Sequence, residues 1–330
     1  MMLMSRIDLI SRYLVPAVQA RLPLISKPYT SALRLFNGFT EGIPGLSVDL
    51  YGKTLVLHNY GKPPSRFEGE CIEAAAVVKS MLPGIEATVQ KARYAKDPTV
   101  RNGLTKGKPD KLIEENGVLY SINLTLNQDA GFYLDTRMLR RWIHDNADGL
   151  AVLNTFAYTG SLGIAALAGG ATRVVHVDIK DRFLEMARAS TLLNGFQPQP
   201  EDFLCMDFFT AAGRLKQRPE RFDIVILDPP FFSKTRKATF DMNRDTPRLI
   251  NKVRPLVKDQ GLLIVVNNAL FLTGKKLIDS IRKLCSSGYL EILELLPVPG
   301  DMCGFNITSA MPFPADPAPF NHPTKIIILR

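Results

Sequence analysis

The stretch FDIVILDPPFF (222–232) is an apolar run that ends in a single carboxylate, Asp228, followed by two prolines and two phenylalanines. Proline has no backbone N–H to give to a sheet, so a strand must end at Asp228 and the chain beyond it must leave the sheet. Because the run is apolar on both faces, it is typical of a central strand that helices cover on both sides. The side chains that follow it are placed to meet a ligand.

Four more runs of this kind alternate with helical patterns in the same part of the chain. They are AVLNTF (151–156), TRVVHVD (172–178), DFLCMD (202–207) and GLLIVVN (261–267). Strands alternating with helices predict an α/β fold, a doubly wound Rossmann-like parallel sheet whose ligand crevice lies at the carboxyl ends of the strands. Earlier in the chain, a helix and then short strands broken at glycines predict a smaller α+β domain. We expect one domain at 1–127 and a second at 128–330.

Composition narrows the class of protein. The 330 residues are 46% hydrophobic and 22% charged, which suits two globular domains. No apolar stretch approaches the roughly 18 residues of a membrane span, and charged residues interrupt the N-terminal helix, so we expect neither a membrane segment nor a signal peptide. The four cysteines lack disulfide or metal-site spacing, which favours a reducing, cytoplasmic location and no metal.

The net charge of +9 points to nucleic acid as a partner. The segment 91–111 is densely basic, with seven Lys or Arg against two Asp, and its glycines and prolines predict a surface loop. A charged loop of this kind is also typical of plain solvated surface. A second basic segment, 233–258, follows the two prolines, where contact with phosphate is favoured.

The turn NTFAYTGSLG (154–163) follows the first strand of the predicted sheet. A dinucleotide fingerprint would need G-x-G-x-x-G here, so that a pyrophosphate could reach the helix N-terminus, but Phe156 and Tyr158 fill the glycine positions. A bulky turn suits a smaller nucleoside and disfavours a nicotinamide oxidoreductase. Gly160 and Gly163 still allow the backbone to approach a ligand.

Aspartates end the next two strands. Asp178 stands where a carboxylate can accept hydrogen bonds from both ribose hydroxyls, and Asp207 can take an adenine amino group while Phe208 packs on the base. Each aspartate by itself is equally typical of a helix N-cap. Together with the turn before them, they favour a nucleoside ligand.

Five motifs resemble those of class I S-adenosylmethionine-dependent methyltransferases, and more narrowly the large-subunit rRNA methyltransferase family with its C5-cytosine and N7-guanine enzymes. They are RLFNGFTEGIPGLSVDLYG (34–52), DAGFYLDTR (129–137), NTFAYTG (154–160), HVDIK (176–180) and DPPFF (228–232). The resemblance implies S-adenosyl-L-methionine as cofactor and 23S-type rRNA as partner. Many members begin with an N-terminal PUA domain, whereas here only a helix precedes the first strands, so we expect RNA to be captured by residues 30–127. The cofactor-binding residues expected from the resemblance and the strand ends are Tyr133, Arg137, Asn154, Phe156, Thr159, Gly160, Asp178, Asp207, Phe208 and Asp228.

The region after the fifth strand bears on the target atom. Methylation of cytosine C5 requires a thiolate that adds to C6, because C5 is not nucleophilic before that adduct forms. In the cytosine enzymes of the resembled family this cysteine follows the fifth strand, where this chain has Asn267 and Asn268. We expect Cys205 to be a small core residue, and Cys303 is only a remote candidate for the attacking thiol. The asparagine pair instead resembles the guanine-N7 half of the fused large-subunit rRNA methyltransferase. Guanine N7 carries a lone pair that attacks a methyl sulfonium directly, so orienting the base is enough.

The sequence therefore predicts an RNA methyltransferase that acts on guanine N7, with a phenylalanine after the prolines stacking on the flipped base. Transfer to cytosine C5 or to an exocyclic amine stays open, as does an RNA-binding protein without activity, and nothing indicates the oligomeric state. The expected catalytic residues are Asp228, Pro229, Phe231 and Asn267. The expected RNA-contacting residues are Lys91, Arg93, Lys96, Lys234 and Arg236.

Overall fold

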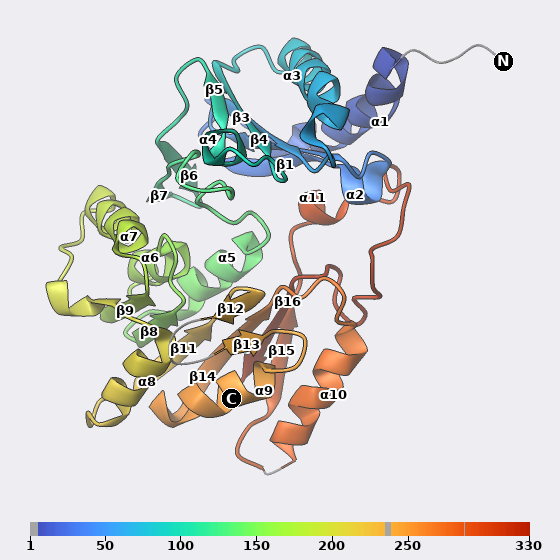
Figure 1. Cartoon of the computed structure of the whole chain (residues 1–330). Coiled ribbons are helices and arrows are strands. Elements are labelled where there is room, and N and C mark those ends of the chain that lie inside the picture. Colours follow the sequence, from blue (N-terminus) through green and yellow to red (C-terminus); the bar gives the residue numbers. More distant parts are fainter. Residues whose placement is uncertain (1–5, 235–238, 287) are drawn as a thin grey trace. The chain divides into compact units, whose positions relative to one another are not determined.

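The computed structural model describes residues 6–234, 239–286 and 288–330, which Figure 1 colours along the chain. The chain divides into two compact units. The first consists of Met1–Leu134 with Pro299–Phe313, and the second of Asp135–Val298 with Pro314–Arg330. The sequence placed 299–313 in the second domain, whereas this segment returns to the first unit.

The first unit is an α+β structure around a five-stranded sheet in the order β1-β2-β3-β4-β5. Strands β3 and β4 pair in parallel, and the other neighbours pair antiparallel. Helices α1 and α3 pack on the sheet, where Leu14 and Val78 join strand residues such as Leu35 in one apolar core. The bounds are α1 Arg6–Arg21, β1 Ala32–Asn37, α2 Gly38–Glu41, β2 Leu46–Tyr51, β3 Thr54–Asn59, α3 Glu68–Met81, β4 Ala87–Ala92, α4 Pro98–Asn102, β5 Leu104–Lys106, β6 Leu112–Glu115, β7 Val118–Ser121 and α11 Gly300–Cys303.

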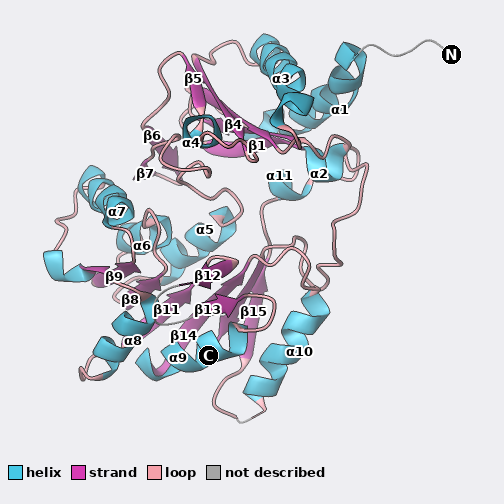
Figure 2. Cartoon of the chain, viewed as in Figure 1, coloured by secondary structure: helices cyan, strands magenta, loops and turns pink. Residues whose placement is uncertain are grey.

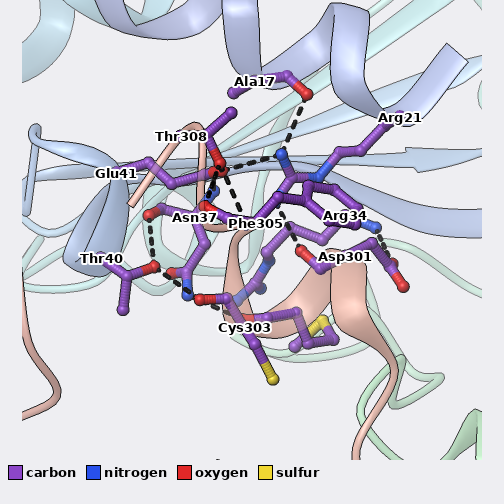
Figure 3. A network of polar contacts seen from close by, with 11 residues as sticks. Ala17, Arg21, Arg34, Asn37, Thr40, Glu41, Asp301, Cys303, Phe305 and Thr308 are labelled. Carbon is purple, nitrogen blue, oxygen red and sulfur yellow. Dashed lines mark hydrogen bonds and ion pairs between the residues drawn. The ribbon is translucent and has the colours of Figure 1, made fainter. Parts of the chain in front are cut away.

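A buried polar network ties the returning segment to the start of the chain (Figure 3). Arg21, the last residue of α1, donates to Glu41 Oε1 at 2.9 Å and to the carbonyl oxygen of Asp301 at 2.7 Å, and the side chains of the Arg21–Glu41 ion pair are fully buried. Glu41 also accepts the backbone N–H of Asn37 at 2.8 Å. Because the two buried charges are paired and hydrogen-bonded, the network can hold the segment in place. The motif at 34–52 thus contributes to the structure of the first unit.

The second unit contains a seven-stranded sheet. Figure 2 shows helices packed alongside its strands. Its core joins apolar strand residues such as Leu153 and Val225 to helix residues such as Leu249 and Ile281. The bounds are α5 Arg137–Asn146, β8 Ala151–Thr155, α6 Ser161–Ala168, β9 Arg173–Asp178, α7 Asp181–Leu193, β10 Phe203–Cys205, α8 Phe208–Lys216, β11 Phe222–Leu227, β12 Phe232–Lys234, β13 Thr239–Asp241, α9 Thr246–Val253, β14 Val257–Asn267, α10 Gly274–Cys285, β15 Ile292–Leu296 and β16 Lys325–Leu329.

The order of the large sheet is β10-β9-β8-β11-β14-β16-β15. The first five strands are parallel, as predicted, and β16 and β15 extend the sheet with antiparallel pairing. The chain adds β9 and β10 on one side of β8 and then crosses to β11 on its other side. In such sheets the ligand crevice lies at the carboxyl ends of the strands where the order reverses. Here that point lies between the ends of β8 and β11.

Candidate active site

The turn between β8 and α6 has a strained backbone, which is held by hydrogen bonds to the end of β9. Phe156 and Tyr158 have φ values of 54° and 51°, in the left-handed region that residues other than glycine rarely adopt. The Tyr158 N–H donates to Asp178 Oδ2 at 2.9 Å, and the Ala157 N–H donates to the carbonyl oxygen of Val177 at 2.8 Å. Strain of this kind persists where the surroundings over-determine the backbone, and it is frequent at ligand sites.

The two glycines of the turn allow close packing beneath it. A Cβ on Gly160, whose φ is 82°, would lie 2.5 Å from the Cβ of Ala187, and a Cβ on Gly163 would lie 2.4 Å from a ring carbon of His176. The His176 ring is fully buried, and burial lowers its pKa to about 4, so it is neutral. Its Nδ1 lies 3.4 Å from Nδ2 of Asn154, which is also buried. The turn therefore rests on a tightly packed, uncharged layer.

The two strand-end aspartates have different roles. Asp178 Oδ1 accepts the N–H of Lys180 at 2.9 Å while Oδ2 accepts that of Tyr158, and burial raises the pKa of this carboxyl group. Asp207 is the N-cap of α8, since it accepts the backbone N–H of Thr210 at 3.1 Å and also its hydroxyl. Asp207 therefore has the alternative role of a helix N-cap, whereas Asp178 supports the turn between β8 and α6.

Phe208 differs from its sequence prediction. The sequence expected this ring to pack on a base, but it is buried and stacks on Phe156, with ring centroids 4.6 Å apart and planes inclined by 23°. Phe208 begins α8, and its side chain enters the apolar core of the second unit. The half-buried Phe156 is thus the ring nearer to the surface, and Phe208 supports it.

The remaining residues expected at the cofactor are divided between the units. Arg137 begins α5 in the second unit, and Thr159 is buried within the turn. Tyr133 belongs to the first unit, is 43% exposed, and donates its hydroxyl to Asp129 at 3.3 Å. At the carboxyl edge of the second-unit sheet, the structure brings together Asn154, Phe156, Thr159, Gly160 and Asp178.

Asp228 follows β11, the strand next to β8. Its carboxyl group is half-buried, and no hydrogen bond to it forms within the part of the chain that the structure describes. Burial, and after it the nearby charge of Asp135, raises the pKa of Asp228 to about 7. Asp135 itself accepts the hydroxyl of Thr324 at 2.7 Å. A carboxyl group that titrates near neutrality at a strand end is a typical feature of a functional site.

Asn267 ends β14 and is fully buried. Its Nδ2 donates to the carbonyl oxygen of Met242 and to the hydroxyl of Thr246, both at 3.0 Å, and its Oδ1 accepts the N–H of Ala269 at 3.0 Å. Met242 in turn donates its N–H to the carbonyl oxygen of Phe231 at 3.0 Å. These contacts favour a positioning role for Asn267, in which it fixes the segment that carries the phenylalanines.

The residues after Asp228 present apolar side chains. Pro229 is buried, whereas Phe231 and Phe232 are 42% and 55% exposed. Exposure of two neighbouring rings leaves apolar area that a stacked base could cover.

A buried lysine at the same edge was missed by sequence reasoning. Lys325 begins β16 opposite Asn267 and donates its ammonium group to the carbonyl oxygens of Ala269, at 2.9 Å, and Pro323. Burial lowers its pKa to about 8. The signal in the sequence is a single cation before the apolar run IIIL, which by itself does not indicate a site.

Comparison with known proteins identifies the family. Residues 75–308, more than half of the chain, match the family described as S-adenosylmethionine-dependent methyltransferase. The chain belongs to this methyltransferase family. YwbD of Bacillus subtilis strain 168, a candidate ribosomal RNA large subunit methyltransferase, is 32% identical over 309 residues, which cover 91% of this chain and 76% of YwbD. Ribosomal RNA large subunit methyltransferase I of Aeromonas salmonicida strain A449 is 34% identical over 237 residues, which cover 70% of this chain and 59% of that protein.

Solved structures confirm the fold of this methyltransferase. SMU.776, a candidate methyltransferase crystallised with S-adenosylhomocysteine, has a TM-score of 0.84 at 24% identity, over 100% of this chain and 83% of that one. A candidate S-adenosylmethionine-dependent methyltransferase from Streptococcus mutans has a TM-score of 0.82 at 23% identity, over 100% and 82% of the two chains. These structures confirm the predicted fold class, and the family match confirms the predicted S-adenosylmethionine-dependent methyltransferase.

The methyltransferase uses S-adenosyl-L-methionine, which supplies an electrophilic methyl group when bound. The sheet edge suits such a nucleoside. The Asp178 carboxylate accepts backbone N–H groups of Tyr158, Lys180 and Ile179, and the lone-pair capacity that remains of about four positions can accept a ribose hydroxyl. The half-buried ring of Phe156 lies beside it as an apolar surface. These two residues would hold the nucleoside part of the cofactor.

One of the expected RNA contacts of the methyltransferase is wrong. Lys91 is 2% exposed, and its ammonium group donates to the carbonyl oxygens of Asn102, Asn127 and Asp129. Burial lowers its pKa to about 8. The Lys91 side chain points inward from β4, and its ammonium group holds the neighbouring backbone in place. It is therefore not available to phosphate.

The other expected RNA contacts are partly described. Arg93 is exposed and lies 3.5 Å from Asp129 Oδ1, and Lys96 is exposed. For Lys234 the structure describes the backbone, in β12, and Arg236 lies outside the described residues.

The cysteines also depart from expectation. Cys205 was predicted to lie in the core, but it is exposed at the end of the short edge strand β10, where its thiol faces the Ile179 carbonyl oxygen at 3.7 Å. Cys303 belongs to the first unit, and burial raises its pKa to about 11. At neutral pH little of Cys303 is therefore thiolate.

Among the described residues, no group of three or more metal-binding side chains occurs. Within the same residues, no helix has the length and apolar character to cross a membrane.

Proposed function

We propose that this enzyme methylates guanine N7 in large-subunit rRNA, in the cytoplasm. The rRNA substrate is supported by the relatives, several of which are named ribosomal RNA large subunit methyltransferases I, K and K/L. The choice of guanine N7 rests on the end of β14. Asn267 and Asn268 occupy the position where the cytosine enzymes of the resembled family have their cysteine.

The positions of the second-unit cysteines argue against cytosine C5. Cys205 ends β10, which is three strand spacings of about 4.8 Å, or roughly 14 Å, from β11 and Asp228. Cys285 is the last residue of α10, a 12-residue helix that follows β14, and it lies roughly 17 Å along that helix from its first residue, Gly274. Neither thiol is within reach of a base held beside Asp228.

Direct transfer needs orientation and charge more than acid–base chemistry. The N7 lone pair forms a bond to the methyl carbon while the bond from that carbon to sulfur breaks, and the electron pair leaves on sulfur. No proton moves, and the base gains a positive charge. The negative charges of Asp228 and Asp135 would stabilise that developing charge, and stacking on Phe231 or Phe232 would hold the ring in line, an effect that can supply roughly 7–11 kcal/mol.

The test compares RNA products and covalent trapping. Ribosomal RNA from a deletion strain is incubated with the purified enzyme and cofactor, and its nucleosides are analysed by mass spectrometry. We expect 7-methylguanosine, and strand scission at that site after borohydride and aniline.

A parallel reaction uses RNA that contains 5-fluorocytosine, which traps a cysteine adduct. We expect no covalent complex with the wild-type enzyme. A stable adduct together with 5-methylcytidine would instead establish the cytosine reaction, and N2-methylguanosine would establish transfer to an exocyclic amine.

A further inference from the structure

Asn268, the residue after β14, has a buried amide oxygen without a hydrogen-bond partner in the described part of the chain. Buried polar atoms are nearly always paired, because an unpaired one loses its bond to water and gains nothing in exchange. An exception at the carboxyl edge of a catalytic sheet indicates an acceptor that awaits a donor from a ligand.

The backbone on both sides of Asn268 is fixed. Before it, Asn267 makes its three side-chain hydrogen bonds, one of which accepts the N–H of Ala269. After it, the ammonium group of Lys325 donates to the carbonyl oxygen of Ala269 at 2.9 Å. Asn268 is thus held between two anchored residues, which pre-organises its amide.

Its place in the sheet puts Asn268 beside the methyl-transfer site. Strands β11 and β14 are parallel neighbours with Leu227 opposite Val265, so in this register Asp228 is level with Val266 and Asn268 lies two residues, roughly 7 Å, further along. Both residues follow the carboxyl ends of adjacent strands. Neighbouring strands lie about 4.8 Å apart. The Asp228 carboxylate and the Asn268 amide oxygen are both acceptors without a hydrogen bond among the residues described.

We propose that Asn268 is a specificity-determining residue that accepts a hydrogen bond from the N–H edge of the target guanine, at N1 or at the exocyclic amino group. This inference rests on the proposed function. Adenine presents an acceptor at N1, so an amide oxygen at this place favours guanine over adenine. Because N7 and the N–H edge lie on opposite sides of the purine, the contact also fixes the rotation of the ring about its own axis.

The experiment combines protein variants with substrate analogues, in the manner of a double-mutant cycle. Wild type, Asn268→Leu and Asn268→Asp are assayed on an rRNA fragment with guanosine, inosine or N1-methylguanosine at the target; inosine lacks the amino group and N1-methylguanosine lacks the N1–H. Asn146→Leu, which changes an exposed asparagine at the end of α5, is the matched control. Calorimetry gives the cofactor affinity of each variant.

We expect Asn268→Leu to lower kcat/KM on guanosine about 10- to 100-fold with unchanged cofactor affinity, the size expected for a lost base contact. With one of the two analogues, wild type and Asn268→Leu should become equal, since the contact is then already absent. Asn268→Asp keeps a hydrogen-bond acceptor and should retain more activity than Asn268→Leu. Because the leucine removes an unpaired polar atom, its melting temperature should equal or exceed that of wild type, which a structural role for Asn268 would not give.

Two outcomes would overturn the inference. If both analogues cost wild type and Asn268→Leu the same factor, Asn268 reads neither group, while the proposed function stands. If the wild-type enzyme leaves guanosine unmethylated at N7 and modifies another base, the proposed function fails first and the inference fails with it.

Discussion

Asp228 joins the chemistry of the site to its pH dependence. Its pKa is raised to about 7 by burial and by the charge of Asp135, so near neutrality only part of the enzyme carries the ionised carboxylate. Methylation of a ring nitrogen leaves the base positively charged, and the ionised form stabilises that charge whereas the protonated form does not. The rate should therefore depend on the ionisation of this one group.

We predict that kcat rises with pH through about 7 and then levels off, and that Asp228→Asn lowers kcat roughly 10- to 1000-fold and removes this pH step. Rate measurements from pH 5.5 to 8.5 at saturating RNA and cofactor test it. A step that persists in Asp228→Asn would assign the titration to another group.

The same carboxyl group should affect stability with the opposite sign. Its pKa is higher in the folded protein, so between about pH 4 and pH 7 the unfolded chain releases a proton that the folded chain keeps, and stability falls as pH rises. We predict that Asp228→Asn is more stable than wild type at pH 8, by on the order of 2–4 kcal/mol, but not at pH 4. Urea unfolding at the two pH values measures this difference, and equal gains at both would refute the linkage.

Which residues lie at the strand ends could be predicted, because each apolar run shows where its strand ends. Which way a side chain faces could not be predicted. Lys91 was expected at phosphate and lies beneath a loop, whereas Cys205 was expected in the core and is exposed, because β10 is a short edge strand. Asn268 shows a further limit, since an unpaired amide oxygen is visible only when every neighbour is placed.

At the scale of elements, Asn267 links β14 to the segment between β12 and α9 that follows the two prolines. It bonds the Met242 carbonyl and the Thr246 hydroxyl, and Met242 is bonded to Phe231. The position of the aromatic rings beside Asp228 thus depends on one buried amide.

We predict that Asn267→Ala lowers kcat about 10- to 100-fold, because a small displacement of the stacking rings misaligns the base, and destabilises the fold by about 2–3 kcal/mol through the groups left unpaired. Cofactor affinity should stay within about twofold, since within the described part of the chain the side-chain hydrogen bonds of Asn267 go to Met242, Thr246 and Ala269 and not to Asp178 or its turn. Single-turnover kinetics and calorimetry separate the two effects. A loss of cofactor binding that equals the loss of rate would argue for a general collapse of the sheet edge.

The five parallel strands were predictable because each is an apolar run followed by a helical period. Strands β15 and β16 were not, because their pairing is antiparallel and a long connection separates them in sequence. They matter to the site, since β16 carries Lys325 to the end of β14. The glycine-poor turn was read correctly as bulky, but its left-handed backbone at Phe156 and Tyr158 required the structure.

At the scale of the whole molecule, the chain leaves the second unit after Val298 and returns to it at Pro314. Local sequence signals could not predict this excursion, because it is fixed by long-range contacts such as those of Arg21 with Glu41 and Asp301. The first unit therefore depends on two segments that are far apart in the sequence, Met1–Leu134 and Pro299–Phe313.

The net charge of +9 bears on RNA binding by the whole molecule. Each cation that neutralises a phosphate releases counterions, so affinity falls with salt in proportion to the number of contacts. Of the three RNA contacts predicted within the basic segment 91–111, Lys91 is buried, whereas Arg93 and Lys96 are exposed. Of these three residues, Arg93 and Lys96 can take part in that exchange and Lys91 cannot.

We predict that Arg93→Ala with Lys96→Ala weakens RNA binding and flattens the slope of log affinity against log salt by about 1–2, while the melting temperature stays within a few degrees of wild type. Lys91→Met should do the reverse. It leaves the carbonyl oxygens of Asn102, Asn127 and Asp129 without their donor and so lowers stability by on the order of 3 kcal/mol, while the salt slope of the protein that remains folded is unchanged. Filter binding between 50 and 300 mM salt, with thermal unfolding of the same preparations, compares the two. An unchanged slope in the exposed double variant would mean that 91–111 is plain solvated surface and that RNA is held elsewhere on the enzyme.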